Sequence, residues 1–149
     1  MSQHISYLTV DISTDSSVFE FISTGPKGDI KKVIQFEKTD TPNVYNLSFG
    51  NLLNDGSIDD TTINDNKDRN KILATVADTV YNFTSRSPDI YVFFSGSTLE
   101  RTRLYRMAIS VYYEILSKTF NIWGLLKNGY TELFKKNCNY TGFLIKRKL

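Results

Sequence analysis

Hydrophobic and polar side chains alternate through most of the first third of the chain. Because successive side chains of a strand point to opposite faces, this pattern predicts strands at 18–24, 29–38 and 44–49, and it is compatible with another at 8–12. Gly-Pro-Lys-Gly at 25–28 is a strong turn signal, since glycine allows positive φ and proline fixes its own. We therefore expect an antiparallel meander.

The period changes to that of a helix after an aspartate-rich stretch at 50–68. Apolar residues then repeat at three and four residues, which predicts one helix at 69–85 and a second from Ser97 to about Lys118. Between the helices every residue of 90–94 is apolar, and this predicts a central strand covered on both faces.

The last third returns to strand character. Apolar runs at 120–126 and 130–134 flank the hairpin sequence Asn-Gly, and a last strand is expected at 140–146. Residues 1–149 thus predict one α+β domain: an antiparallel meander, two amphipathic helices and a C-terminal hairpin packed together, in the order roughly βββ(β)αβαββ. A chain of 149 residues can bury a sufficient core without disulfides.

The start of the second helix carries the most distinctive chemistry. Ser-x-x-Glu at 97–100 has the spacing of a capping box, which makes Ser97 the expected N-cap. On a helical wheel Arg101 lies at the centre of the apolar face, whereas Arg103 and Arg106 lie on the polar side. The other residues of the apolar face are Leu104, Tyr105, Ala108, Val111, Tyr112, Ile115 and Leu116.

A cation facing the core needs an anionic partner, because an unpaired buried charge is costly. One alternative is a carboxylate of this chain, for which the candidates are Glu20, Asp59, Asp60 and Asp89. The other is a bound phosphate, because a helix N-terminus favours anions. The candidate anion-binding residues are Ser95, Gly96, Ser97, Thr98, Arg101 and Arg103.

The net charge is +2, but it is distributed unevenly. Residues 1–68 carry 11 acidic and 5 basic side chains, and residues 69–149 carry 5 acidic and 13 basic ones. This asymmetry indicates either compensation within the fold or a basic face for an anionic partner. With exposed aromatic rings, such a face would suit single-stranded nucleic acid. Its residues would be Arg103, Arg106, Lys135, Lys136, Lys146, Arg147 and Lys148, with Tyr113, Tyr130 or Tyr140.

The chain lacks the residues that several classes of protein require. Cys138 is the only cysteine and His4 the only histidine, so an internal disulfide, a multi-cysteine zinc site and a histidine-based triad or dyad are not expected. Residues 95–98 match neither a Walker A loop nor Gly-x-Ser-x-Gly. No metal or cofactor is predicted, and whether the chain is an enzyme stays open. No signal peptide or membrane span is visible, so we expect a soluble, cytoplasmic protein with no membrane contact.

Four separated blocks, at 21–32, 43–50, 94–105 and 139–148, match a known pattern in order. The third reads Phe-x-Gly-Ser-Thr-x-x-Arg-Thr-Arg-Leu-Tyr. Through these blocks nearly the whole chain resembles an uncharacterised bacterial family of domains of unknown function. The resemblance implies a bacterial protein whose single domain often makes up the entire product, and it brings no substrate, cofactor or catalytic residue.

Three functions are open. The leading interpretation is a binding module for a phosphate-bearing partner, nucleic acid or nucleotide, through Ser95–Arg103. The second is a structural or protein-interaction component, a homo-oligomer or the partner of another protein, with Arg101 in a buried ion pair. The small single-domain type suggests a toxin–antitoxin or defence role for it. The third is a metal-dependent nuclease, with the metal on Asp59 or Asp60.

Overall fold

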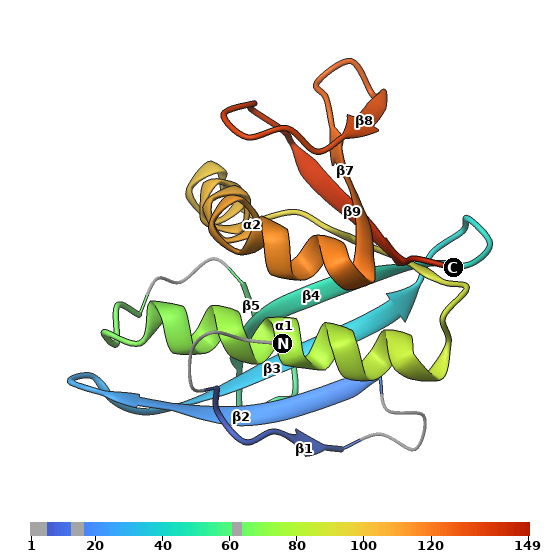
Figure 1. Cartoon of the computed structure of the whole chain (residues 1–149). Helices are drawn as coiled ribbons and strands as arrows, with labels where there is room; N and C mark the ends of the chain where they lie inside the picture. Colours follow the sequence, from blue (N-terminus) through green and yellow to red (C-terminus); the bar gives the residue numbers. More distant parts are fainter. Residues whose placement is uncertain (1–5, 13–16, 61–63) are drawn as a thin grey trace. The chain divides into compact units, whose positions relative to one another are not determined.

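The computed structural model describes residues 6–12, 17–60 and 64–149 (Figure 1). The fold is α+β with mostly antiparallel strands, as the sequence predicts. The elements, in chain order, are β1 (Val10–Asp11), β2 (Val18–Gly25), β3 (Gly28–Lys38), β4 (Val44–Leu52), β5 (Ile58–Asp59), α1 (Arg69–Arg86), β6 (Tyr91–Phe94), α2 (Leu99–Thr119), β7 (Phe120–Leu125), β8 (Thr131–Leu133) and β9 (Gly142–Arg147).

The chain divides into two compact units. The first unit comprises residues 1–37 and 48–86, and the second comprises residues 38–47 and 87–149. β4 contributes to both, because its residues up to Leu47 belong to the second unit and those from Ser48 belong to the first. The single domain expected from the sequence stays a prediction.

The core of the first unit lies between its strands and α1. β1, β2 and β3 are antiparallel neighbours, and β5 pairs with the end of β4. The register sets Phe19 opposite Ile34, and both side chains are almost fully buried. α1 packs against this face, where the rings of Phe36 and Phe83 stack with their centroids 4.3 Å apart. The apolar residues that repeat with the strand period in β2 and β3 and with the helix period in α1 thus pack into one common core.

A buried lysine lies on the core face of β3. Lys32 is only 4% exposed, and its Nζ donates to Asn51 Oδ1 at 2.5 Å and to Asn64 Oδ1 at 2.7 Å. The same ammonium lies 5.8 Å from the centre of the Phe49 ring. Polar partners of this kind reduce the cost of burying a charge.

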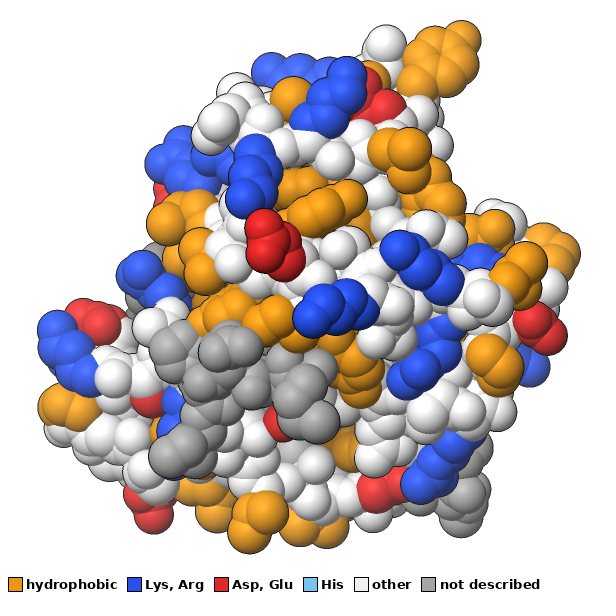
Figure 2. Space-filling model, viewed as in Figure 1, with side chains coloured by type: hydrophobic (Ala, Val, Ile, Leu, Met, Phe, Trp, Pro, Cys, Tyr) orange, Lys and Arg blue, Asp and Glu red, His pale blue; other side chains and the backbone are white. Residues whose placement is uncertain are grey.

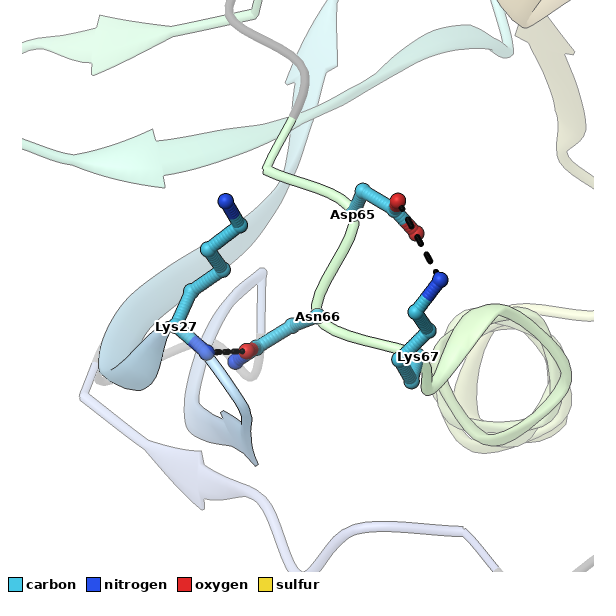
Figure 3. A network of polar contacts seen from close by, with 4 residues as sticks. All are labelled: Lys27, Asp65, Asn66 and Lys67. Carbon is cyan, nitrogen blue, oxygen red and sulfur yellow. Dashed lines mark hydrogen bonds and ion pairs between the residues drawn. The ribbon is translucent and has the colours of Figure 1, made fainter.

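The segment before α1 is fixed to the β2–β3 turn by a buried amide. Asn66 Oδ1 accepts from the Lys27 backbone N–H at 2.7 Å, and Asn66 Nδ2 donates to Gly28 O at 2.9 Å. Beside it, Asp65 and Lys67 form an exposed ion pair with an N–O distance of 3.6 Å (Figure 3). The buried amide, rather than the ion pair, accounts for the position of this segment, since exposed ion pairs contribute little.

The second unit is a sheet with the strand order β4-β6-β9-β7-β8. β6 runs parallel to the start of β4, and the other neighbours are antiparallel. α2 joins β6 to β7 and lies on one side of β7 and β9 (Figure 1). The rings of Phe94 and Tyr105 meet with their centroids 5.4 Å apart, and those of Tyr113 and Phe134 are 5.8 Å apart.

The register separates the two faces of this sheet. On the face toward α2, Val92, Ile145 and Ile122 form a buried cross-strand row. Side chains one position along each strand point to the opposite face. They form two further rows, Tyr91–Lys146–Asn121 and Phe93–Leu144–Trp123. We call these six residues the open sheet face, because each is partly or fully exposed and all six lie on the side of the sheet opposite Val92, Ile145 and Ile122.

The expectation that 90–94 is covered on both faces is therefore wrong. Val92 is fully buried, but Tyr91 and Phe93 stay partly exposed on the open sheet face. Apolar residues at every position do not require two covering layers, because large aromatic side chains are often only partly buried.

Candidate functional site

The predicted anion site is a tight turn between β6 and α2. Thr98 is the N-cap, in an extended conformation with φ −128° and ψ 163°, and its Oγ1 accepts from the Arg101 N–H at 3.2 Å. The expectation that Ser97 caps the helix is therefore wrong by one residue. Both residues carry a hydroxyl, and the backbone of the turn selects the one whose side chain reaches the N3 amide.

Gly96 fixes the turn against the first turn of the helix. Its N–H donates to Thr102 Oγ1 at 3.0 Å, and the same hydroxyl donates to Thr98 O at 3.1 Å. A Cβ at Gly96 would lie 2.3 Å from the Thr102 backbone nitrogen and 2.5 Å from Arg101 Cβ. The close approach of two backbone segments therefore requires glycine here.

The groups that can bind an anion lie around this turn. Ser95, Ser97 and Arg103 are exposed, and Arg101 is half-buried. A helix leaves its first amides without intrahelical partners, and the cap satisfies that of Arg101. The amides of Leu99 and of the next residue point out of the same helix end, where the helix dipole favours negative charge.

The three arginines of this segment differ in their surroundings. Arg103 is exposed, as the helical wheel predicts. Arg106 is half-buried, and its Nη1 donates to Asn139 Oδ1 and, at 3.4 Å, to Cys138 O. This contact places Cys138 and Asn139, which follow the exposed Lys135 and Lys136, against the second turn of α2.

The apolar face predicted for α2 is correct only in part. Ile109 is the buried residue of this helix, and Val111, expected on the apolar face, is 73% exposed. Arg101, expected at the centre of that face, is half-buried. The buried side of α2 is therefore rotated toward Ile109, away from Val111.

The other basic residues lie at the far end of β9. Lys146 Nζ lies 5.8 Å from the centre of the Tyr91 ring, and the Arg147 guanidinium lies 5.5 Å from that of Phe120. The predicted basic surface thus falls into two groups, one near the start of α2 and one near the end of β9.

The two compact units also differ in net charge. The first unit holds 7 basic and 11 acidic residues, a net charge of −4. The second holds 11 basic and 5 acidic residues, a net charge of +6. Lys and Arg side chains are frequent over the part that carries α2 and β7–β9 (Figure 2). The second unit is therefore the one whose field attracts anions.

The predicted carboxylate partners of Arg101 are distributed over both units. Glu20 lies on β2 and Asp59 on β5, with Asp60 directly after it, and all three belong to the first unit. Asp89 is exposed in the second unit, which also holds Arg101. A structural ion pair of Arg101 stays a prediction.

The described residues contain no group of three or more His, Cys, Asp or Glu side chains that could hold a metal ion. His4 lies outside the described residues. Cys138 is half-buried. No helix in the described ranges has the length and apolar character needed to cross a membrane.

Two of the three tyrosines expected at the surface pack inside the second unit. Tyr140 is 5% exposed, and its hydroxyl donates to Glu132 Oε2 at 2.7 Å and accepts from the Lys135 N–H at 3.0 Å. Burial, together with the bond to Glu132, raises the pKa of the Tyr140 hydroxyl well above its ordinary value. Tyr113 is half-buried against Phe134. Tyr130 is exposed, as expected.

Sequence reasoning missed the aromatic residues of the open sheet face. Tyr91 and Trp123 lie on β6 and β7, and their ring centroids are 5.9 Å apart. The signal was present in the alternation of Asn121, Ile122 and Trp123, but the face became visible only when β9 was seen to lie between β6 and β7.

The chain belongs to the family of unknown function DUF6934, whose pattern matches residues 3–148. No curated protein and no solved structure matches it significantly. Membership of this family establishes a relationship but no activity.

Proposed function

We propose that this chain is a binding module for a phosphate-bearing partner, nucleic acid or nucleotide, which contacts the turn and helix start at Ser95–Arg103. The observation that carries the proposal is the coincidence of three features at one place. The N-terminus of a 21-residue helix, exposed serine hydroxyls and an exposed arginine lie together in a unit of net charge +6.

Each group has a defined role in this proposal. The first amides of α2 donate to phosphate oxygens, where the dipole adds the equivalent of about half a positive charge. Ser95 and Ser97 donate their hydroxyls, and Arg103 and Arg101 supply charge-assisted hydrogen bonds. The bonds of Thr102 hold the turn before the ligand arrives, which lowers the entropy cost of binding.

A matched pair of charge deletions on α2 tests the proposal. Arg103→Gln and Lys118→Gln each remove one exposed positive charge, at opposite ends of the helix. The probe is a labelled 12-nucleotide single-stranded DNA, followed by fluorescence anisotropy, with ADP as the nucleotide probe. A lost charge-assisted contact corresponds to about 10- to 100-fold weaker binding for Arg103→Gln, whereas Lys118→Gln should change affinity by less than about 3-fold. Equal effects of the two variants would contradict a site at the helix start.

A second candidate, self-association through α2, is favoured by one specific observation. Leu99, Met107 and Val111 are 83%, 48% and 73% exposed and lie within an arc of about 120° of the helix. Exposed large apolar residues that share part of one helix surface favour a contact with another molecule. In the antiparallel register that sets Arg103 of one copy opposite Glu114 of the other, the two-fold symmetry forms two such ion pairs.

The two candidates predict different effects of one substitution on α2. Glu114→Arg breaks the proposed pairing and should turn a dimer into a monomer in sedimentation equilibrium. In the anion-binding proposal the same variant adds positive charge to the unit, about 16 Å along the helix from Arg103, and at low salt it strengthens binding of the oligonucleotide. A monomer whose wild-type and variant forms sediment alike would remove the second candidate.

A further inference from the structure

We infer that the open sheet face binds single-stranded nucleic acid by stacking bases on its aromatic rings. The inference rests on the proposed function in one respect, namely that the phosphate-bearing partner is a nucleic acid. It adds a surface that the helix start does not include, on the side of the sheet away from α2 (Figure 1).

The residues of the open sheet face have the chemistry of such a surface. Tyr91, Phe93 and Trp123 present partly exposed rings, and the Tyr91 and Trp123 centroids are 5.9 Å apart. Lys146 lies directly opposite Tyr91 in the register, with its Nζ 5.8 Å from the ring centre. Exposed Asn121 follows in the same row and offers an amide to base edges. Stacking is tolerant of sequence, because every base has a π face.

A protein partner fits this face less well. The centres of protein–protein interfaces are depleted in lysine, and Lys146 lies in the middle strand of the face, between Tyr91 and Asn121. The unit also carries a net charge of +6, which complements a phosphate backbone rather than an average protein surface.

The spacing of the rings favours a single strand over a duplex. Along β6, Tyr91 and Phe93 are two residues apart, which is roughly 7 Å in a strand. Neighbouring bases in a duplex are only about 3.4 Å apart and shielded between base pairs. Bases that contact both rings must therefore be unstacked, which a single strand permits at low cost.

The open sheet face and the anion site are continuous along the chain. Phe93 precedes Ser95 by two residues, and Gly142 allows the Phe93 ring to lie close to its backbone, since a Cβ there would be 2.8 Å from the ring. A strand that stacks on Phe93 can thus place a phosphate near the turn at Gly96.

Trp123 is the only tryptophan, so its fluorescence reports this face directly. We expect saturable quenching of Trp123 emission by a 12-nucleotide oligothymidylate at 50 mM NaCl. In anisotropy titrations with the same labelled oligonucleotide, Trp123→Leu should weaken binding by about 5- to 100-fold. The control Tyr130→Leu removes a ring that is 72% exposed but outside the two rows, and it should change affinity by less than about 2-fold.

Lys146→Gln supplies a test that does not depend on removing an aromatic ring. Loss of one phosphate contact reduces the slope of log K against log salt by about 0.7 for a single strand. Lys118→Gln, on α2, should leave the slope unchanged. These measurements use the whole chain, and circular dichroism of each variant shows whether it is folded.

The outcomes separate this inference from the proposed function. In one outcome the oligonucleotide binds, Arg103→Gln weakens this binding, the oligonucleotide does not quench Trp123 fluorescence, and Trp123→Leu does not change the affinity. The anion site then stands, and the sheet-face inference is wrong. If no oligonucleotide binds but ADP does, the sheet-face inference is again wrong. A blue shift of Trp123 emission with rising protein concentration, without any oligonucleotide effect, would show that a second copy covers the face and would also overturn the inference.

Discussion

Gly96→Ala is the substitution whose effect the structure determines most closely. At an unconstrained site, alanine in place of glycine stabilises a protein by about 0.4–1 kcal/mol, because the unfolded chain loses freedom. At Gly96 the added Cβ would lie 2.3 Å from the Thr102 nitrogen and 2.6 Å from the Arg101 carbonyl carbon. Ordinary contacts between such atoms are about 3.5–4 Å, so the turn or the first turn of α2 must move by more than an ångström.

The expected cost has two parts. Overpacking of this kind costs about 1–3 kcal/mol, and loss of the bond from the Gly96 N–H to Thr102 Oγ1 adds about 1 kcal/mol. The free energy of unfolding should therefore fall by about 2–4 kcal/mol. With a urea m-value of about 2 kcal/mol/M, the unfolding midpoint should drop by about 1–2 M.

Trp123 emission is the appropriate signal, because Trp123 and Gly96 belong to the same unit. Ser95→Ala is the control, because Ser95 is exposed. The urea unfolding midpoint of this variant should stay within about 0.3 M of that of the wild type. A midpoint for Gly96→Ala that equals or exceeds that of the wild type would refute the close backbone approach on which the geometry of the candidate site depends.

Three further predictions concern named hydrogen bonds. Thr98→Ala removes the N-cap of α2 and should cost about 1 kcal/mol, which lowers the melting temperature by about 2–4 °C, and Thr98→Asn should restore it. Asn66→Ala removes the acceptor of the Lys27 amide and should cost about 2–4 kcal/mol and speed hydrogen exchange at Lys27. Tyr140→Phe should cost about 1–2 kcal/mol at pH 7. The pKa of wild-type Tyr140 is raised, so above about pH 10 the folded state keeps a proton that the unfolded state loses, and the free energy of unfolding of the wild type falls as pH rises. In a plot of the free energy of unfolding against pH, Tyr140→Phe should therefore fall less steeply than the wild type above about pH 10, whereas Tyr130→Phe should follow the wild type.

Local pattern in the sequence was sufficient for most elements of the fold. The alternation at 18–24 and 29–38 correctly predicted β2 and β3. The spacing of three and four residues correctly predicted α1 and α2, with bounds within two residues of the observed ones at each end. These elements depend on neighbours in sequence, so their periods are visible in one chain.

Pairing between distant strands was not visible in the sequence. β6 pairs in parallel with β4, and β9 lies between β6 and β7, although the chain reaches β7 and β8 first. Nothing in the local pattern specifies this order, because it depends on which strands meet after α2 crosses the sheet. The open sheet face was missed for the same reason, since its two rows each draw on three strands.

Errors in the candidate site had local physical causes. Ser97 and Thr98 can both cap a helix, and only the backbone conformation selects Thr98. Tyr140 looked like a surface ring among lysines and asparagines, but Gly124 leaves room for it on β7, where a Cβ would lie 2.3 Å from the ring. A glycine on a neighbouring strand gives no sign, in the sequence, of which ring it will accommodate.

The most direct test of the central claim is the salt dependence of oligonucleotide binding by the wild-type chain. Anisotropy of a labelled 12-nucleotide single strand should show saturable binding at 20 mM NaCl. Three phosphate contacts predict that log K falls linearly with log salt with a slope of about −2. The absence of any binding at 20 mM NaCl, or an affinity that does not change with salt, would contradict the account.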